Sequence, residues 1–155
     1  MANKYLYLVA FILVCEMAGI IGSFFTAESV STWYLTLEKP PFNPPSWVFA
    51  PVWTTLYALM GISAYLVFFS GKKESRFALV VFALQLALNT LWSLAFFGLQ
   101  SPLYGLVVIA ALWLAIVWTM LRFYNISKNA TYLLVPYILW VSFAAVLNYS
   151  IWALN

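Results

Sequence analysis

Long apolar runs separated by short polar breaks dominate the chain. A helix that crosses a membrane needs about 20 mostly apolar residues, and the pattern predicts such helices over residues 5–25, 47–69, 77–97, 103–124 and 131–154. Hydrocarbon offers no hydrogen-bond partners, so each segment must satisfy its backbone groups internally, which favours helices. We therefore expect an all-α integral membrane protein, with residues 1–155 forming a single domain of five transmembrane helices.

The first connection differs from the others because it is long and rich in proline and tryptophan. Residues 33–53 read WYLTLEKPPFNPPSWVFAPVW. Proline fixes φ and removes a backbone donor, so we expect neither a regular helix nor a central strand here. The segment is predicted to be a stiff, partly polyproline-II-like loop. A rigid aromatic loop above a helical bundle is typical of a lid over a binding site. The prolines in this segment are Pro40, Pro41, Pro44, Pro45 and Pro51.

Composition narrows the class of protein and the kinds of chemistry. Hydrophobic residues make up 66% of the chain and charged residues 7%, whereas a soluble domain has roughly 25% charged residues. A water-soluble globular protein is therefore excluded. The chain has no histidine, which excludes a histidine-ligated haem, a histidine-ligated zinc hydrolase and a Ser-His-Asp hydrolase. Its one cysteine, Cys15, excludes an intrachain disulfide.

Charge predicts how the helices are oriented. With five spans, six of the seven basic residues fall on one side of the membrane and only Lys39 falls on the other. Basic residues concentrate in cytoplasmic loops, so we expect a multi-pass cell-membrane protein with a cytoplasmic N-terminus. The first loop and the C-terminus should lie on the opposite face. This placement of the cations explains the net charge of +3 without nucleic-acid binding, which we do not expect. The six residues are Lys4, Lys72, Lys73, Arg76, Arg122 and Lys128.

Helical spacing brings tryptophan and amide side chains to inward faces. Amides are costly against lipid, so Gln85, Asn89 and Asn148 should point into the bundle. An interior that combines indoles with a few amides suits a flat aromatic ligand. Alternatively, the amides join helices by hydrogen bonds worth about 1 kcal/mol each, and the indoles fill the bundle. The predicted faces are Trp53, Tyr57, Met60, Gly61 and Ala64; Gln85, Asn89, Trp92 and Phe96; and Pro136, Trp140, Ala144 and Asn148.

The first helix carries two further features. Glu16 is the only acid deep within an apolar span, and it could serve in a proton relay or an ion site, or form a structural hydrogen bond in its protonated state. Small residues four positions apart, Ala18 and Gly22 or Gly19 and Ser23, permit close helix packing and indicate a possible dimer face.

Three motifs together resemble one family. They are WYxxLxKPxFxPPxWVFxPVWxxLYxxMG over Trp33–Gly61, QLALNxxWSxxFFG over Gln85–Gly98, and PYxLWVxFAxxLNYxIW over Pro136–Trp152. The chain resembles the translocator protein family, which includes bacterial tryptophan-rich sensory proteins and mitochondrial peripheral benzodiazepine receptors. The resemblance covers the whole chain.

The resemblance implies a homodimer of five-helix bundles with a pocket below the first loop. Such a pocket binds porphyrins such as protoporphyrin IX, and isoquinoline-carboxamide or benzodiazepine-type drugs, with no covalently bound cofactor and no metal. Light-dependent oxidative degradation of the porphyrin is implied as the activity, with Trp53 and Trp140 as the reactive residues. The ligand-binding residues carried over are Tyr34, Pro44, Trp53, Asn89, Trp92, Trp140, Ala144, Leu147 and Asn148.

Two alternatives to a degrading receptor stay open: a transporter of tetrapyrroles, and a ligand sensor or scaffold without catalysis. One family feature is incomplete. The cholesterol-recognition pattern of animal members would use Leu147 and Tyr149, but no basic residue follows between Ser150 and Asn155. This departure argues against high-affinity sterol binding.

Overall fold

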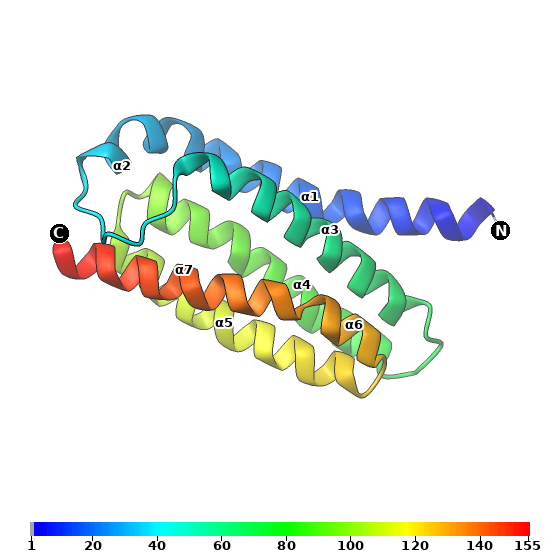
Figure 1. The fold of residues 1–155 in the computed structure, drawn as a ribbon. Coiled ribbons are helices and arrows are strands. Elements are labelled where there is room, and N and C mark those ends of the chain that lie inside the picture. Colours follow the sequence, from blue (N-terminus) through cyan, green and yellow to red (C-terminus); the bar gives the residue numbers. More distant parts are fainter. Residues whose placement is uncertain (1) are drawn as a thin grey trace.

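The structure is a computed structural model that describes residues 2–155, and it is a bundle of long helices (Figure 1). Within these residues there are no strands, and five helical segments are long and apolar enough to cross a membrane. The predicted fold class is therefore confirmed. The elements are α1 (Ala2–Ser31), α2 (Trp33–Thr36), the 3₁₀ helix η1 (Ser46–Val48), α3 (Phe49–Phe68), α4 (Ser75–Ser93), the π-helical turn η2 (Leu94–Gly98), α5 (Pro102–Tyr124), α6 (Lys128–Leu133) and α7 (Val135–Leu154).

α1 continues for six residues beyond the end that was predicted at Phe25. The last two turns contain polar residues beyond the apolar run, but their hydroxyls bond to carbonyls of the same helix. Thr26 donates to the Gly22 carbonyl at 3.1 Å, and Ser31 and Thr32 both donate to the Glu28 carbonyl, at 3.1 and 2.8 Å. Hydroxyl groups that bond back in this way are compatible with a continuing helix.

The proline-rich segment is more helical than predicted. Only residues 37–45 lack regular structure, because α2 and η1 occupy its flanks and α3 already begins at Phe49. Pro51 is the third residue of α3, a position whose backbone N–H has no acceptor inside the helix, so proline removes nothing there. The expectation of a loop is therefore wrong for residues 33–36, which form α2, whereas the helical residues from Ser46 onward agree with the helix predicted over residues 47–69.

The last predicted helix, over residues 131–154, is divided in two. α6 ends at Leu133, and α7 begins at Val135 with Pro136 in its first turn. Because Pro136 has no N–H to donate, the helical ladder is interrupted one turn earlier. Leu134 forms the junction, and its N–H bonds to carbonyls in α6.

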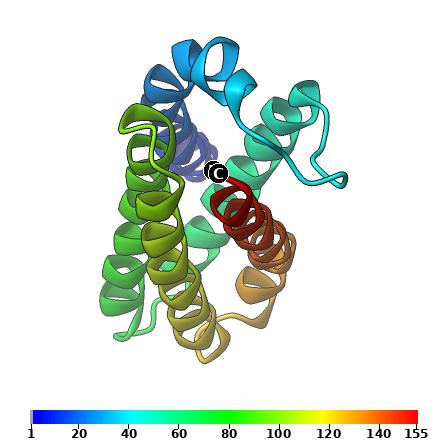
Figure 2. The same ribbon diagram turned by 90° about the vertical axis from the view of Figure 1, so that its left-hand side faces the viewer.

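The long helices α1, α3, α4, α5 and α7 form the bundle (Figures 1 and 2). α1 packs against α3 and α4, while α5 packs against α4 and α7. Gly61 in α3 allows the backbones of α1 and α3 to approach closely, since a Cβ there would lie 2.5 Å from the Cα of Ile12 in α1. The N-terminus lies at one end of the bundle, and the C-terminus lies at the other end beside the loop of residues 37–45 (Figure 1). The loop and the C-terminus thus share one end, as predicted from the number of spans.

Candidate functional site

A groove of about 590 Å³ runs between α3 and α7. On α3 the lining residues recur at intervals of three or four positions, and on α7 they come from successive turns. Each wall of the groove is therefore one face of a helix. The groove is apolar apart from Thr55, whose hydroxyl already donates to the Pro51 carbonyl at 2.8 Å. Its volume falls within the range of small-molecule sites. The lining residues are Pro51, Val52, Thr55, Leu56, Leu59, Pro136, Leu139, Trp140 and Phe143.

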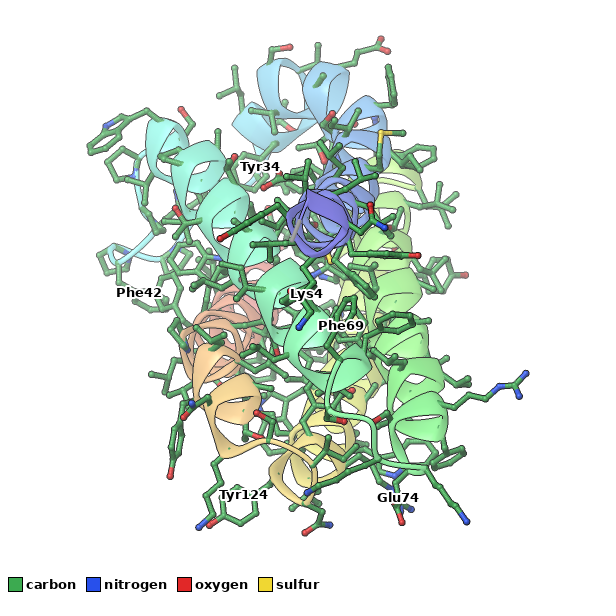
Figure 3. All side chains as sticks on the ribbon, turned by 90° about the vertical axis from the view of Figure 1, so that its right-hand side faces the viewer. Lys4, Tyr34, Phe42, Phe69, Glu74 and Tyr124 are labelled. Carbon is green, nitrogen blue, oxygen red and sulfur yellow. The ribbon has the colours of Figure 1, made fainter. Side chains whose placement is uncertain are left out.

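The proline-rich loop reaches the edge of this groove through Phe42. The ring of Phe42 meets the ring of Phe143 edge-on, with centroids 6.3 Å apart. Phe42 is exposed, and Figure 3 shows it standing at the side of the bundle near the start of α3. The loop therefore contributes one aromatic side chain beside the groove and leaves the groove open along its length.

Trp140 is the one residue of the predicted ligand set that lines the groove. Its indole lies between Phe49 of α3, at a centroid distance of 5.9 Å, and Phe143 of α7, at 5.5 Å. The indole Nε1 is buried and has no hydrogen-bond partner within the described part of the chain. An unpaired buried donor costs about 1–3 kcal/mol. Trp140 thus lines the groove with its ring, while its Nε1 is a covered donor beside the groove that the protein itself does not satisfy.

Trp53 lies behind the groove, although its neighbour Val52 lines it. Its ring stacks on Tyr57, with centroids 5.6 Å apart and planes inclined by 28°. It also meets Tyr137 of α7 edge-on at 6.4 Å. The two tryptophans predicted to be reactive thus belong to facing helices, with Trp140 at the groove and Trp53 against two buried phenols.

A chain of hydrogen bonds crosses the interior behind Trp53. Tyr57 donates to Oδ1 of Asn89, Asn89 donates through Nδ2 to the Tyr137 hydroxyl at 3.0 Å, and Tyr137 donates to Oε1 of Gln85 at 2.7 Å. Gln85 and Asn89 are only 1% and 3% exposed, which confirms that both amides point inward. Because each amide is bonded to phenols of other helices, both join α4 to its neighbours, as the alternative interpretation predicted.

Asn148 joins three helices nearer the loop end. Its Oδ1 accepts a hydrogen bond from Nε1 of Trp92 at 3.1 Å, and its Nδ2 donates to the Pro102 carbonyl at 2.8 Å. The side chain is 2% exposed, so its predicted inward orientation is confirmed. Ala144 and Leu147 are buried on the same helix. Of the predicted ligand-binding residues, Trp92, Ala144, Leu147 and Asn148 therefore do not line the groove.

Pro44 lies in the loop, and Tyr34 lies in α2, where its ring meets Phe96 and Phe97 of η2 at centroid distances of 6.3 and 5.7 Å. Tyr34 donates to Oδ1 of Asn43 at 2.9 Å, and the ammonium of Lys39 lies 4.8 Å from the centre of its ring. Burial raises the pKa of Tyr34 above its ordinary value, and the hydrogen bond to Asn43 lowers it by less. Nδ2 of Asn43 in turn donates to the carbonyl of Pro44 at 3.3 Å. These contacts hold the loop in a defined shape.

The loop is also fastened to the end of α7. The backbone N–H of Glu38 donates to Oδ1 of Asn155 at 2.9 Å, and Nδ2 of Asn155 donates to the Glu38 carbonyl at 3.0 Å. Nδ2 also donates to the Ile151 carbonyl at 2.8 Å, which ties the amide to α7. This paired contact, which we call the Asn155 clamp, was not foreseen from the sequence because a terminal asparagine carries no pattern.

Most of the groove residues were also missed at the sequence level. The repeated spacing of Pro51, Thr55 and Leu59, and of Pro136, Leu139 and Phe143, could have marked two apolar faces. In a membrane helix every face is apolar, however, so this spacing does not distinguish a groove wall from a lipid-facing surface. The site prediction relied instead on polar residues such as Asn89 and Asn148, which lie in the packed interior.

The features of α1 contribute to packing within the chain. Gly19 lies against the ring of Tyr57, and Gly22 lies against Ser93. The carbonyl of Ala18 accepts a hydrogen bond from Thr90 at 3.1 Å. Three of the four small residues that indicated a dimer face therefore pack against α3 or α4, whereas Ser23 is exposed and its hydroxyl bonds to the Ile20 carbonyl of α1. Glu16 is half-buried on the same helix.

The comparison with protein families is decisive for the identity of the chain. The TspO/MBR family is matched over residues 11–153. The chain belongs to the TspO/MBR family. It is 50% identical to "Tryptophan-rich protein TspO" of Chlorobaculum tepidum over 157 residues, covering 100% of this chain and 99% of the relative.

Relatives in other organisms carry different names. The chain is 37% identical to "Tryptophan-rich sensory protein" of Cereibacter sphaeroides, over 94% of this chain and 89% of the relative. It is 36% identical to "Translocator protein" of Bos taurus, over 100% of this chain and 94% of the relative. The resemblance inferred from the three motifs is therefore confirmed. Membership of the TspO/MBR family supports a receptor or sensor role for this multi-pass membrane protein.

Proposed function

We propose that the protein is a membrane receptor that binds porphyrins such as protoporphyrin IX and promotes their light-dependent oxidative degradation. The groove between α3 and α7 is the proposed site, and isoquinoline-carboxamide drugs are expected to compete for it. The observation that carries the proposal is the buried, unpaired Nε1 of Trp140, a residue that lines an apolar groove of about 590 Å³. A macrocycle with carboxylate groups offers both the apolar surface and the acceptors that such a groove requires.

Binding through Nε1 requires a small rearrangement. Because the nitrogen is covered, the indole must turn or one of the rings of Phe49 and Phe143 must move before an acceptor reaches it. The energy of the unpaired donor favours such a movement, since a bound acceptor removes a penalty of about 1–3 kcal/mol. Because the ring of Phe42 in the loop contacts the ring of Phe143, a movement of Phe143 would also displace Phe42.

The proposed chemistry needs no acid–base machinery. Light makes the bound porphyrin a one-electron oxidant, and Trp140 or Trp53 donates one electron to it. The products of that step are an indolyl radical cation and a porphyrin radical anion, and dioxygen is the oxidant consumed as the reduced macrocycle is degraded. The protein contributes position and a restricted environment, as proteins do for other light- or redox-active groups. Tyr57 and Tyr137 hold Trp53 in place by ring contacts.

The test is illumination of the purified protein with protoporphyrin IX, with and without an isoquinoline-carboxamide competitor. We expect the wild type to change the porphyrin spectrum and the competitor to prevent that change. The double variant Trp53→Phe and Trp140→Phe keeps aromatic rings at both positions but removes the indoles, so binding should stay measurable while illuminated turnover is lost. Unchanged bleaching in the double variant would exclude the indole mechanism.

The same preparation separates the other two functions. A transporter would move porphyrin across liposomes in the dark without changing its spectrum. A sensor or scaffold would bind porphyrin with neither movement nor degradation. Degradation that depends on light and on the two indoles distinguishes the proposed receptor from both.

A further inference from the structure

Six of the seven basic residues belong to elements and connections at the end of the bundle opposite the loop. Figure 3 looks onto this end, with Lys4 and Glu74 labelled. The six basic residues come from α1, from the connection between α3 and α4, from the first turn of α4, from the last turn of α5 and from the start of α6. Glu74 is the only acid among them. Setting the orientation of the chain requires only that these charges lie on one side, and does not require them to surround a concavity. Three of these basic residues, Lys72, Lys73 and Arg76, nevertheless line a groove.

A groove of about 540 Å³ lies between the end of α3 and the start of α4. Its residues divide into a cationic part, at the end of the bundle, and an apolar part further along the helices. Leu79 and Val80 lie about one turn beyond Ser75 and Arg76, which places them about 6 Å deeper in the membrane. The lining residues are Phe68, Lys72, Lys73, Ser75, Arg76, Leu79 and Val80.

The three cations of this groove are exposed, but they are not equally free. Nζ of Lys72 donates to the carbonyl of Asn125 at 2.8 Å, so it bridges the α3–α4 connection to the end of α5. An ammonium has three donors, which leaves two for another acceptor. Lys73 and Arg76 are exposed on either side of Glu74 and Ser75. One cation is therefore held in place while two others can close on an anion.

The apolar wall is held by a cluster of aromatic rings. Phe68 contacts Tyr7 and Phe11 of α1, with centroid distances of 6.1 and 5.3 Å. Tyr7 also contacts Phe69 at 5.5 Å. Aromatic residues are enriched at the interface between membrane and water, and this cluster places the groove at that level.

We propose that this groove binds one anionic phospholipid. The phosphate lies among Lys72, Lys73 and Arg76, and an acyl chain follows Phe68, Leu79 and Val80 into the bilayer. Basic pockets between transmembrane helices bind anionic head groups, and each cation near a membrane surface contributes about 1 kcal/mol. The combination of cations and an apolar wall in one groove favours a lipid over a soluble anion, which has no need of the wall. This site is independent of the groove between α3 and α7.

The first experiment compares lipid retention by native mass spectrometry of the detergent-solubilised protein. Phosphatidylglycerol and phosphatidylcholine with identical acyl chains are offered together. The wild type should retain phosphatidylglycerol in preference. The variant K72Q/K73Q/R76Q should lose that preference, by about fivefold in relative affinity for each charge removed.

The matched control is K4Q/R122Q/K128Q, which removes three cations from the same end but outside the groove. It should keep the preference of the wild type. An equal loss in both triple variants, or no preference in the wild type, would overturn the proposal. Circular dichroism during heating establishes that each variant is folded before its lipid retention is compared.

A second experiment tests the apolar wall. The variant L79S/V80S keeps every cation, so it should retain less phosphatidylglycerol while its charge is unchanged. Soluble glycerophosphate should not displace the lipid from the wild type, because it cannot use Phe68, Leu79 and Val80. Displacement by glycerophosphate at equal concentration would identify a simple anion site and contradict the assignment to a lipid.

Discussion

Trp140 differs from the other indoles whose hydrogen bonds the structure describes. Trp92 donates to Asn148 and Trp113 donates to Ser142, whereas Nε1 of Trp140 is the only buried side-chain nitrogen or oxygen atom in residues 2–155 with no partner. A donor that stays unpaired in the protein alone favours a role in binding, because it lowers stability until a ligand arrives.

We predict that Trp140→Phe lowers porphyrin affinity without lowering stability. Phenylalanine keeps an aromatic ring against Phe49 and Phe143 and removes a donor that has no bond to lose. Affinity should fall about fivefold, equivalent to about 1 kcal/mol, and the melting temperature should stay the same or rise. Porphyrin fluorescence titration and thermal unfolding measure the two effects.

Trp113→Phe is the matched control. It removes an indole that donates to Ser142 at 2.9 Å, so it should lower stability and leave porphyrin affinity unchanged. If both variants lower affinity equally, Trp140 has no special role in binding.

The amide of Asn89 provides a second test at the level of single residues. It bonds both Tyr57 and Tyr137, so Asn89→Leu leaves two buried hydroxyls without this partner. We expect a loss of about 1–2 kcal/mol in the free energy of unfolding. In a variant that also carries Tyr57→Phe and Tyr137→Phe the added cost of Asn89→Leu should largely disappear, because those hydroxyls are absent. Chemical unfolding in detergent measures the free energy of unfolding of each variant. If Asn89→Leu costs the same free energy in both backgrounds, the hydrogen bonds of Asn89 do not stabilise the fold.

The elements differ in how far their sequence determines them. The apolar runs determine that α3, α4 and α5 are helices, because a membrane permits no other structure for them. The sequence determines the helix ends less well. The hydroxyls of Thr26 and Ser31 bond to carbonyls within α1, which continues past the predicted end, and Pro136 follows the junction between α6 and α7. The inward direction of Gln85, Asn89 and Asn148 followed from their cost against lipid. The hydrogen-bond partners of these amides could not be predicted from the sequence, because they depend on how the helices are arranged.

The Asn155 clamp leads to a prediction about the loop. Asn155→Ala removes both hydrogen bonds to the backbone of Glu38, so residues 37–45 should open more often. We expect faster hydrogen exchange at the Glu38 amide, and faster association and dissociation of porphyrin with a smaller change in affinity. Exchange followed by mass spectrometry and stopped-flow fluorescence measure these rates.

The control for the clamp is Ser150→Ala. The Ser150 hydroxyl bonds only to the Val146 carbonyl of its own helix, so its loss should leave the loop unchanged. Identical exchange at Glu38 in wild type and Asn155→Ala would show that the contacts around Tyr34 and Asn43 are sufficient to hold the loop.

At the scale of the whole molecule, the two ends of the bundle differ in chemistry. The loop, the C-terminus and Lys39 lie at one end, and the cationic groove lies at the other (Figures 1 and 3). The groove between α3 and α7 uses the half of α3 nearest the loop. The nearest lining residues of the two grooves on α3, Leu59 and Phe68, are about 14 Å apart along the helix, and no residue lines both grooves, so the two sites can be tested independently.

The distribution of charge predicts the orientation of the chain. Short loops rich in lysine and arginine remain in the cytoplasm, and six basic residues lie at the end that carries the N-terminus, against one at the other. We therefore expect alkaline phosphatase fused after Asn155 to be active in a bacterial host, and a fluorescent protein fused there to be dark. A fluorescent protein fused before the N-terminus should be bright. The opposite pattern would place the loop in the cytoplasm, so that the groove between α3 and α7 would have to receive its ligand from the cytoplasmic half of the membrane.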